Sequence, residues 1–295
     1  MQRRKFLKDT GTIALGVGVF GSIHWINDRF IGDTPTTTDI LGPYYRPNAP
    51  MRINISPEGY SGSVFHLSGT VFRADGTTPF GNCLVEIWQC DENQVYDNTS
   101  DAYKYRGLQK TDSKGKYHFI TAHPVAYKIS EQSNVYRPAH IHMRISGEGQ
   151  QDLVTQIYFK GDSHIEKDPY ASNPHAASRI LPITKNNKNE EIVRFDVVMA
   201  KEFKPSDSVF KKISGVYQMN NNSLREFYRE GDSLFMKLNG QIVAVLAYKG
   251  NNEFVSANDN AVRFELQTNG EVNVCFQKEH STECEETGVK AFKYS

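Results

Sequence analysis

The most informative stretch of the chain is Tyr136-Arg137-Pro138-Ala139-His140-Ile141-His142-Met143-Arg144-Ile145. Successive side chains of a β-strand point to opposite faces of a sheet. As a strand, the stretch carries three apolar side chains on one face, Ile141, Met143 and Ile145, and three polar ones on the other, His140, His142 and Arg144. The apolar face predicts a buried core, and histidines at i and i+2 can present both imidazoles to one metal ion. The alternative is a solvated polar face with two incidental histidines.

Tyrosines upstream of these histidines could complete a metal site, because two histidines alone are too few to hold a catalytic metal firmly. The candidates are Tyr96, Tyr103, Tyr105, Tyr117 and Tyr127. A phenolate is a hard anionic oxygen ligand that suits Fe(III) and is little used for Zn(II). A phenol with a reference pKa of about 10 ionises only beside a strong positive charge, which a ferric ion supplies. The residues alone indicate a His/Tyr ferric site and leave the choice of tyrosines open.

The chain around this stretch has the composition of a strand-rich protein. Aromatic residues make up 12% of the 295 residues, and such residues favour strands. From Ser63 to Met199, short strand patterns alternate with turn sequences, which predicts an all-β fold with a β-sandwich core. Lys plus Arg balance Asp plus Glu at 34 each. Zero net charge argues against a nucleic-acid partner, which needs a clustered basic excess.

A second β domain is predicted after a linker near Lys201–Ser208. Asn239-Gly240 and Asn269-Gly270 each separate two apolar runs, and Asn-Gly is the strongest local indication of a β-hairpin because both turn residues adopt positive φ. We therefore predict a β-sandwich over residues 33–203 and a small antiparallel β-sheet domain over 204–295. The second domain shows no catalytic constellation and is interpreted as a packing or interaction module.

The N-terminus has the pattern of a targeting segment. Arg3-Arg4-Lys5-Phe6-Leu7-Lys8 resembles a twin-arginine export signal, and an apolar run follows from Thr12 to Ile23. That run is shorter than the ~18 residues of a spanning helix, so residues 1–32 are predicted to form a signal or anchor. This predicts a periplasmic or outward-facing, membrane-anchored protein and leaves both cleavage and anchoring open. The alternative is a basic tail before a buried helix.

The four cysteines fall into two pairs with different expectations. Cys83 and Cys90 lie seven residues apart in one predicted strand, a span of over ~20 Å that no disulfide can bridge. Cys275 and Cys284 are spaced to close a small hairpin loop, and an exported protein permits such a disulfide. The spacings do not include CxxC, which argues against a zinc ribbon.

Several segments occur in an order that resembles the intradiol ring-cleavage dioxygenases, a family that includes protocatechuate 3,4-dioxygenase and catechol 1,2-dioxygenase. The resemblance runs from about Leu41 to Ala200. Its segments are Leu41-Gly42-Pro43-Tyr44-Tyr45, Val85-Glu86-Ile87-Trp88-Gln89, Arg106-Gly107, Thr111-Asp112, Gly115-x-Tyr117, Arg137-Pro138-Ala139-His140-Ile141-His142 and Thr155-Gln156-Ile157-Tyr158-Phe159. Together these segments are far more specific than any single one.

The resemblance implies one Fe(III) per chain and a choice of ligands. The family's first iron tyrosine follows the strand tryptophan by eight residues, which from Trp88 leads to Tyr96. Its second tyrosine matches Tyr127, and its histidines match His140 and His142.

The resemblance also implies the reaction. Catechol or a substituted catechol would be cleaved with O₂ to a muconate-type diacid, with Tyr127 accepting a substrate proton. Arg137 would stabilise carbanion-like charge on the substrate, and Gln156 would line the pocket. Two alternatives remain: a non-catalytic binding module for aromatic or carbohydrate ligands, and a zinc or copper site built on the same histidines.

Overall fold

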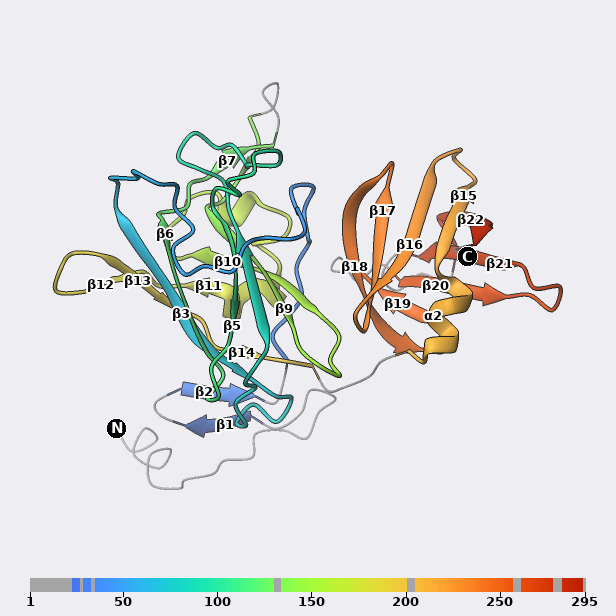
Figure 1. Ribbon diagram of the computed structural model, residues 1–295, viewed down its shortest axis with the longest axis horizontal. Helices are drawn as coiled ribbons and strands as arrows, with labels where there is room; N and C mark the ends of the chain where they lie inside the picture. Colours follow the sequence, from blue (N-terminus) through green and yellow to red (C-terminus); the bar gives the residue numbers. More distant parts are fainter. Residues whose placement is uncertain are drawn as a thin grey trace, which may run out of the picture.

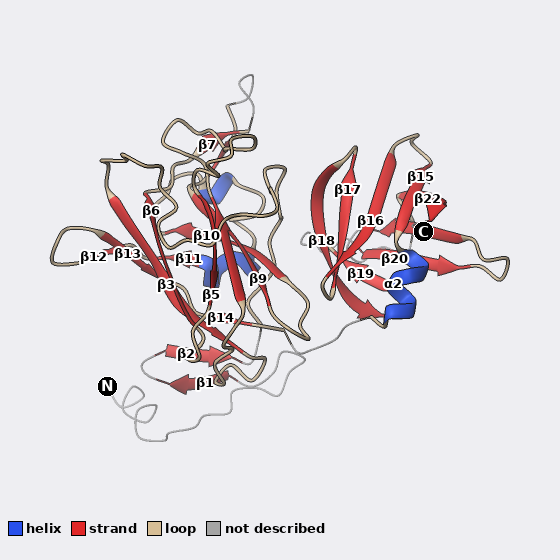
Figure 2. Ribbon diagram, viewed as in Figure 1, coloured by secondary structure: helices blue, strands red, loops and turns tan. Residues whose placement is uncertain are grey.

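The computed structural model describes residues 23–26, 29–32, 35–129, 134–200, 205–256, 261–277 and 283–293. Strands predominate in this part of the chain, as Figure 2 shows. Two larger sheets form a sandwich, and a closed barrel follows it along the chain (Figure 1). The predicted all-β fold, a β-sandwich followed by a small antiparallel β domain, is confirmed. A short hairpin, β1 (Ile23–Ile26) and β2 (Arg29–Gly32), precedes the sandwich.

The sandwich pairs a sheet that carries the candidate site with a second sheet behind it. The first sheet has the order β11-β10-β9-β4-β5, and in the second β12, β13, β3 and β14 are joined by β6, which pairs with β3. The strands are β3 (Val64–Phe72), β4 (Leu84–Trp88), β5 (Arg106–Lys110), β6 (Lys116–Ala122), β9 (His140–Ser146), β10 (Leu153–Phe159), β11 (Ile180–Leu181), β12 (Thr184–Lys185), β13 (Glu191–Arg194) and β14 (Val197–Val198). Two 3₁₀ helices, Ile165–Lys167 and Pro174–Arg179, lie between β10 and β11.

The core lies between the two sheets and contains the apolar face of β9. Ile141, Met143 and Ile145 are fully buried in a cluster that includes Phe65 and Leu67 of β3. The predicted alternation along β9 is therefore confirmed. Burying each such side chain contributes about 1.5–3 kcal/mol. Because the register is set by this burial, the polar residues of β9 must project from the opposite face of the sheet.

The stretch from Tyr136 to Ile145 is not one continuous strand. Tyr136–Arg137 forms β8, which pairs with β7 (Tyr127–Lys128), and β9 begins only at His140. Pro138 has no amide hydrogen and cannot continue a ladder. The break places Tyr127 directly opposite Arg137 in the β7–β8 hairpin.

The barrel runs in strand order from β15 to β22. Its strands are β15 (Gly215–Met219), β16 (Leu224–Glu230), β17 (Ser233–Leu238), β18 (Gln241–Gly250), β19 (Glu253–Val255), β20 (Ala261–Leu266), β21 (Val272–Gln277) and β22 (Glu286–Lys293). Both predicted hairpins form, between β17 and β18 and between β20 and β21.

The two Asn-Gly turns of the barrel differ in type. Asn239 and Gly240 have φ of 50° and 84°, as a two-residue turn with two left-handed positions requires. At the second turn only Gly270 has positive φ, 86°, and its amide donates to the carbonyl of Gln267 at 3.0 Å. The expectation of two positive φ values is therefore wrong there. A longer loop lets a type I turn and one left-handed glycine close the hairpin.

The segment between the two units contains a helix that the sequence patterns did not predict. Helix α2 (Asp207–Ile213) is capped by the Ser206 side chain, which accepts from the Val209 amide at 3.4 Å. The predicted boundary between residues 203 and 204 lies within residues 201–204, which are outside the described residues. Most of the predicted targeting segment, residues 1–22, also lies outside them. Within the described ranges, no helix is long and apolar enough to span a membrane.

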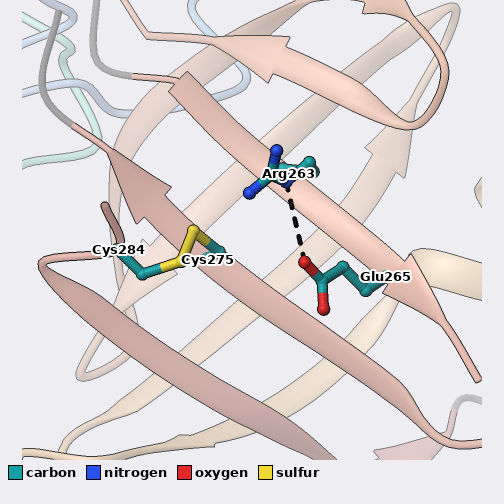
Figure 3. The surroundings of a disulfide bond; sticks show 4 residues. All are labelled: Arg263, Glu265, Cys275 and Cys284. Carbon is teal, nitrogen blue, oxygen red and sulfur yellow. Dashed lines mark ion pairs between the residues drawn. A yellow bond between two sulfur atoms is a disulfide. The ribbon is translucent and has the colours of Figure 1, made fainter. Parts of the chain in front are cut away.

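The cysteine expectations agree with the structure. Cys83 and Cys90 are buried free thiols. Cys275 and Cys284 form a disulfide with Cα atoms 5.4 Å apart, next to an ion pair between Arg263 and Glu265 at 3.7 Å (Figure 3).

Removing this disulfide is expected to destabilise the barrel by about 2–3 kcal/mol, because the cross-link closes a loop with a sequence separation of nine and restricts the unfolded chain. Urea unfolding of the Cys275→Ser, Cys284→Ser variant measures this. Wild-type protein unfolded in reductant is the control and should match the variant. A midpoint equal to that of the oxidised wild type would contradict the prediction.

Candidate metal centre

The two histidines stand on the outer face of the site-bearing sheet. β9 lies between β4 and β10, and His142 is flanked in register by Trp88 and Gln156. Both imidazoles are almost completely buried, at 1% exposure each. Their Nε2 atoms lie 3.2 Å apart. The i, i+2 spacing thus brings two ring nitrogens to one point, because a strand with hydrogen-bonded neighbours on both sides holds them there.

The hydrogen bonding of His140 leaves its Nε2 free as a lone-pair donor. Its Nδ1 lies 2.6 Å from the carbonyl oxygen of Pro138, and a carbonyl only accepts, so Nδ1 carries the hydrogen. Burial, reinforced by the charge of Arg137, lowers the pKa of His140 to about 3. Burial also lowers the pKa of His142 well below its ordinary value. Both imidazoles are therefore neutral at physiological pH, the form that binds metals.

Two tyrosines from different segments of the chain face the histidine pair. The hydroxyl of Tyr96, in the segment between β4 and β5, lies 3.3 Å from Nε2 of His140. Tyr127 of β7 has its ring centre 5.5 Å from that of His140 and 5.6 Å from that of Tyr96. Burial raises the pKa of Tyr127 to about 12 and that of Tyr96 well above its ordinary value. Both stay neutral phenols unless a cation offsets the cost of burying their charge.

This donor set fits a ferric ion. Donor atoms 3.2–3.3 Å apart match neighbouring ligands on an ion with bonds of about 2.1 Å. Neutral imidazoles and phenols that ionise on binding suit a hard trivalent ion. Among the residues that the structure describes, no group of three or more His, Cys, Asp or Glu side chains could hold a metal. A metal centre at these histidines would therefore need ligands of another type, for which Tyr96 and Tyr127 are candidates.

Arg137 is held beside these residues by a buried polar network. Its Nε donates to Asp168 at 2.5 Å, and its Nη2 donates to Oε1 of Gln156 at 2.8 Å and to the hydroxyl of Tyr158 at 3.2 Å. Burial alone would lower the pKa of Arg137, but Tyr158 and Asp168 outweigh it and raise the pKa above its ordinary value. The guanidinium thus remains charged in a dry environment. The two non-ligand site residues predicted from the sequence, Arg137 and Gln156, are brought into direct contact.

The network extends to residues that sequence reasoning missed. The hydroxyl of Tyr158 donates to Asp39 at 2.9 Å, and Asp39 pairs with Arg179 at 2.5 Å. Tyr158 lies in a quoted family segment and pairs with His140 across β10 and β9, which could have identified it. No local pattern distinguishes Asp39, Asp168 or Arg179, which lie far apart in the chain.

Aromatic rings and one glycine form the walls around the ligand candidates. Trp88 stacks on the ring of His142 at 4.9 Å and 6°, and Tyr44 stacks on Tyr96 at 4.4 Å. Gly42 has φ of 76°, and a Cβ there would lie 3.0 Å from Cε1 of His142. Only glycine adopts this positive φ without strain and has no Cβ to meet the imidazole. The Leu41–Tyr45 segment is therefore part of the site.

Comparisons with known proteins agree on one family. Residues 40–201, more than half of the chain, match the family model described as Dioxygenase. The chain is 27% identical over 213 residues to intradiol ring-cleavage dioxygenase prcA of Aspergillus niger, covering 65% of this chain and 67% of that protein. It is 36% identical over 141 residues to the protocatechuate 3,4-dioxygenase beta chain of Burkholderia cepacia (42% and 60%). It is 32% identical over 154 residues to catechol 1,2-dioxygenase 2 of Acinetobacter lwoffii (46% and 55%). The matches span 55–67% of these relatives' lengths.

Solved structures give the same fold. One is 3-chlorocatechol 1,2-dioxygenase from Rhodococcus opacus 1CP, with a TM-score of 0.50, 25% identity and coverage of 57% of this chain and 73% of that one. Another is catechol 1,2-dioxygenase from Pseudomonas arvilla C-1, with a TM-score of 0.51, 24% identity and coverage of 59% and 64%.

Proposed function

The chain belongs to the intradiol ring-cleavage dioxygenase family, and from this premise we propose that it cleaves catechol or a substituted catechol with O₂, using one ferric ion, to a muconate-type diacid. The observation that carries the proposal is a buried cluster of four side chains. Nε2 of His140 lies 3.2 Å from Nε2 of His142 and 3.3 Å from the hydroxyl of Tyr96. The ring centre of Tyr127 lies 5.5 Å from that of His140. A ferric ion held by these four side chains would withdraw electron density from a bound catechol and prepare the ring for O₂.

Tyr127 is proposed as the group that takes a proton from a substrate hydroxyl. It lies opposite Arg137 in the β7–β8 hairpin, and the guanidinium charge opposes the rise in its pKa caused by burial. Burial still raises the pKa of Tyr127 to about 12. Arg137 also opposes the rise in the pKa of Tyr96, but Tyr127 and Cys90 there act more strongly in the other direction. Arg137 therefore offsets burial more effectively at Tyr127, which favours Tyr127 as the group that exchanges a proton.

Arg137 is proposed to stabilise negative charge that develops on the substrate. Its partners Asp168 and Gln156 fix the guanidinium before the reaction, so little reorganisation is needed when charge appears. Gln156 is itself held, because its amide donates to the carbonyl of Ile40 at 2.7 Å.

Arg137→Lys is expected to lower kcat about 10²- to 10³-fold with iron content unchanged. A lysine keeps the charge but cannot bond Asp168 and Gln156 in the fixed geometry of a guanidinium. Steady-state oxygen uptake measures kcat, and Arg194→Lys, at a residue with a 63% exposed side chain, is the matched control. A kcat within twofold of wild type would show that Arg137 does not carry this role.

One experiment tests the proposed function as a whole. Purified protein is loaded with iron, its visible spectrum is recorded, and oxygen uptake is measured with catechol, protocatechuate and hydroxyquinol. The proposal expects a red-brown tyrosinate-to-iron absorption that shifts on adding substrate, and turnover of at least one compound. A colourless protein that binds these compounds without consuming O₂ would instead indicate a binding module. Zinc or copper retained in place of iron would indicate a different metal centre.

We also propose that the protein is exported, as a periplasmic or membrane-anchored enzyme. The twin-arginine pattern at residues 3–8 motivates this, and the Cys275–Cys284 disulfide supports it because such bonds persist in oxidising compartments. Fractionation of cells expressing wild type and the Arg3→Lys, Arg4→Lys variant tests it. The wild type should be found outside the cytoplasm and the variant inside, and equal cytoplasmic retention of both would refute export.

A further inference from the structure

The barrel contacts the same sheet face that carries the ligand candidates. Arg144 lies on β9 two residues beyond His142 and projects from the same face. Its Nη2 donates to Glu230 of β16 at 2.9 Å, and its guanidinium lies 4.8 Å from the ring centre of Phe235 of β17. Residues of two barrel strands, β16 and β17, therefore contact Arg144, which lies two residues after the proposed metal ligand His142.

Further hydrogen bonds fasten the barrel to the turn between β9 and β10. The backbone amide of Asp152 donates to Oγ of Ser233 at 2.8 Å, and the amide of Tyr248 donates to Oε1 of Gln151 at 2.6 Å. Asp152 in turn accepts from Nε of Arg144 at 2.5 Å. The barrel thus contacts Arg144 directly through Glu230. It also bonds, through Ser233, the backbone of Asp152, whose carboxylate accepts from Nε of Arg144.

A chain of contacts leads from Arg144 to His142. Nη1 of Arg144 donates to the hydroxyl of Tyr45 at 2.5 Å. The ring of Tyr45 packs on Trp88 at 5.1 Å, and Trp88 stacks on His142 at 4.9 Å. Phe235 is fully buried in the same apolar cluster as Trp88, Tyr45 and the two tyrosines of the site.

We propose that the C-terminal barrel is a positioning part of the metal centre, which fixes the imidazole of His142 through Glu230, Arg144, Tyr45 and Trp88. The inference rests on the proposed function, since it concerns the metal that His142 would bind. Outer groups that orient a metal-binding histidine typically change metal affinity 10- to 100-fold. Glu230 acts through three intervening side chains, so we expect a smaller effect, about 3- to 10-fold.

Glu230 allows a selective test. Its side chain is 43% exposed, so a charge change there does not bury an unpaired ion in the core. Glu265 is the matched control, because it is a barrel glutamate that is 48% exposed and paired with Arg263 at 3.7 Å. Glu230→Lys would repel Arg144, whereas Glu265→Lys disturbs a glutamate–arginine pair within one barrel strand, β20.

The experiment compares iron-loaded wild type, Glu230→Lys, Glu265→Lys and Tyr45→Phe. Tyr45→Phe keeps the ring on Trp88 but removes the hydroxyl that bonds Arg144. Two quantities are measured: the rate of iron loss to a ferric chelator and the position of the tyrosinate-to-iron absorption band. We expect Glu230→Lys and Tyr45→Phe to lose iron about 3- to 10-fold faster and to shift the band, and Glu265→Lys to match wild type. Thermal unfolding of each variant checks that it is folded.

The proposal is overturned if Glu230→Lys matches Glu265→Lys in both quantities, or if Tyr45→Phe matches wild type in both. A wild type that takes up no iron would instead refute the proposed function. Amide hydrogen exchange along residues 141–145 of the metal-free proteins then still tests the barrel. Faster exchange in Glu230→Lys than in Glu265→Lys supports the proposal that the barrel restrains β9 through Glu230. Equal exchange in the two variants refutes it.

Discussion

Replacing His140 and His142 together by alanine is expected to abolish iron retention, the largest effect predicted for this protein. The double variant leaves two buried phenols, whose pKa values are raised by burial. Without neutral nitrogen donors, phenols alone cannot hold the ion against the cost of ionising them in a dry site. Iron per chain after loading and desalting should fall from about one to background, and the visible absorption should vanish.

Either single variant is expected to lose most of its iron as well, because the two Nε2 atoms lie 3.2 Å apart and act on one point. His175→Ala, at an exposed histidine on the 3₁₀ helix Pro174–Arg179, is the matched control and should load like wild type. Circular dichroism checks that each variant is folded. A double variant that remains fully loaded would refute the ligand set, including the tyrosines chosen with it.

Tyr127→Phe is expected to keep iron but to lower kcat by about 10²- to 10⁴-fold, the range for loss of a general base. Both neutral imidazoles remain together with Tyr96, so iron retention should persist, whereas the proposed proton acceptor is gone. The charge-transfer absorption should weaken, because one of two phenolates is missing. Oxygen uptake and the visible spectrum of the same preparation give both results.

Tyr136→Phe is the matched control for this variant, since it removes a hydroxyl from the same β7–β8 hairpin, where Tyr136 pairs with Lys128. It should retain wild-type turnover. Unchanged turnover in Tyr127→Phe would refute the assignment of Tyr127 as the base, and complete loss of iron would show that it is an indispensable ligand instead.

Local patterns predicted the parts of the fold that depend on neighbours in sequence. The alternation of Ile141, Met143 and Ile145 with the histidines correctly predicted which side chains of β9 enter the sandwich core and which share the opposite face, because side-chain direction in a strand has a period of two. The Asn239-Gly240 hairpin was also predicted from adjacent residues, because Asn-Gly favours a two-residue turn. The errors were also local: Pro138 divides a predicted strand, and Ser206 caps a helix that was not predicted.

The sequence by itself determined the fold class, the two-histidine strand and, through ordered family segments, the candidate residues Tyr96, Tyr127, Arg137 and Gln156. Only the tertiary structure decided how these residues meet and what surrounds them. The pair Arg144–Glu230 joins residues 86 apart in the chain, and Tyr158–Asp39 joins residues 119 apart. Such contacts are absent from any local pattern, because they exist only after distant elements pack and exclude water. Packing therefore assigned the barrel a position beside the site, which its own sequence gave no reason to expect.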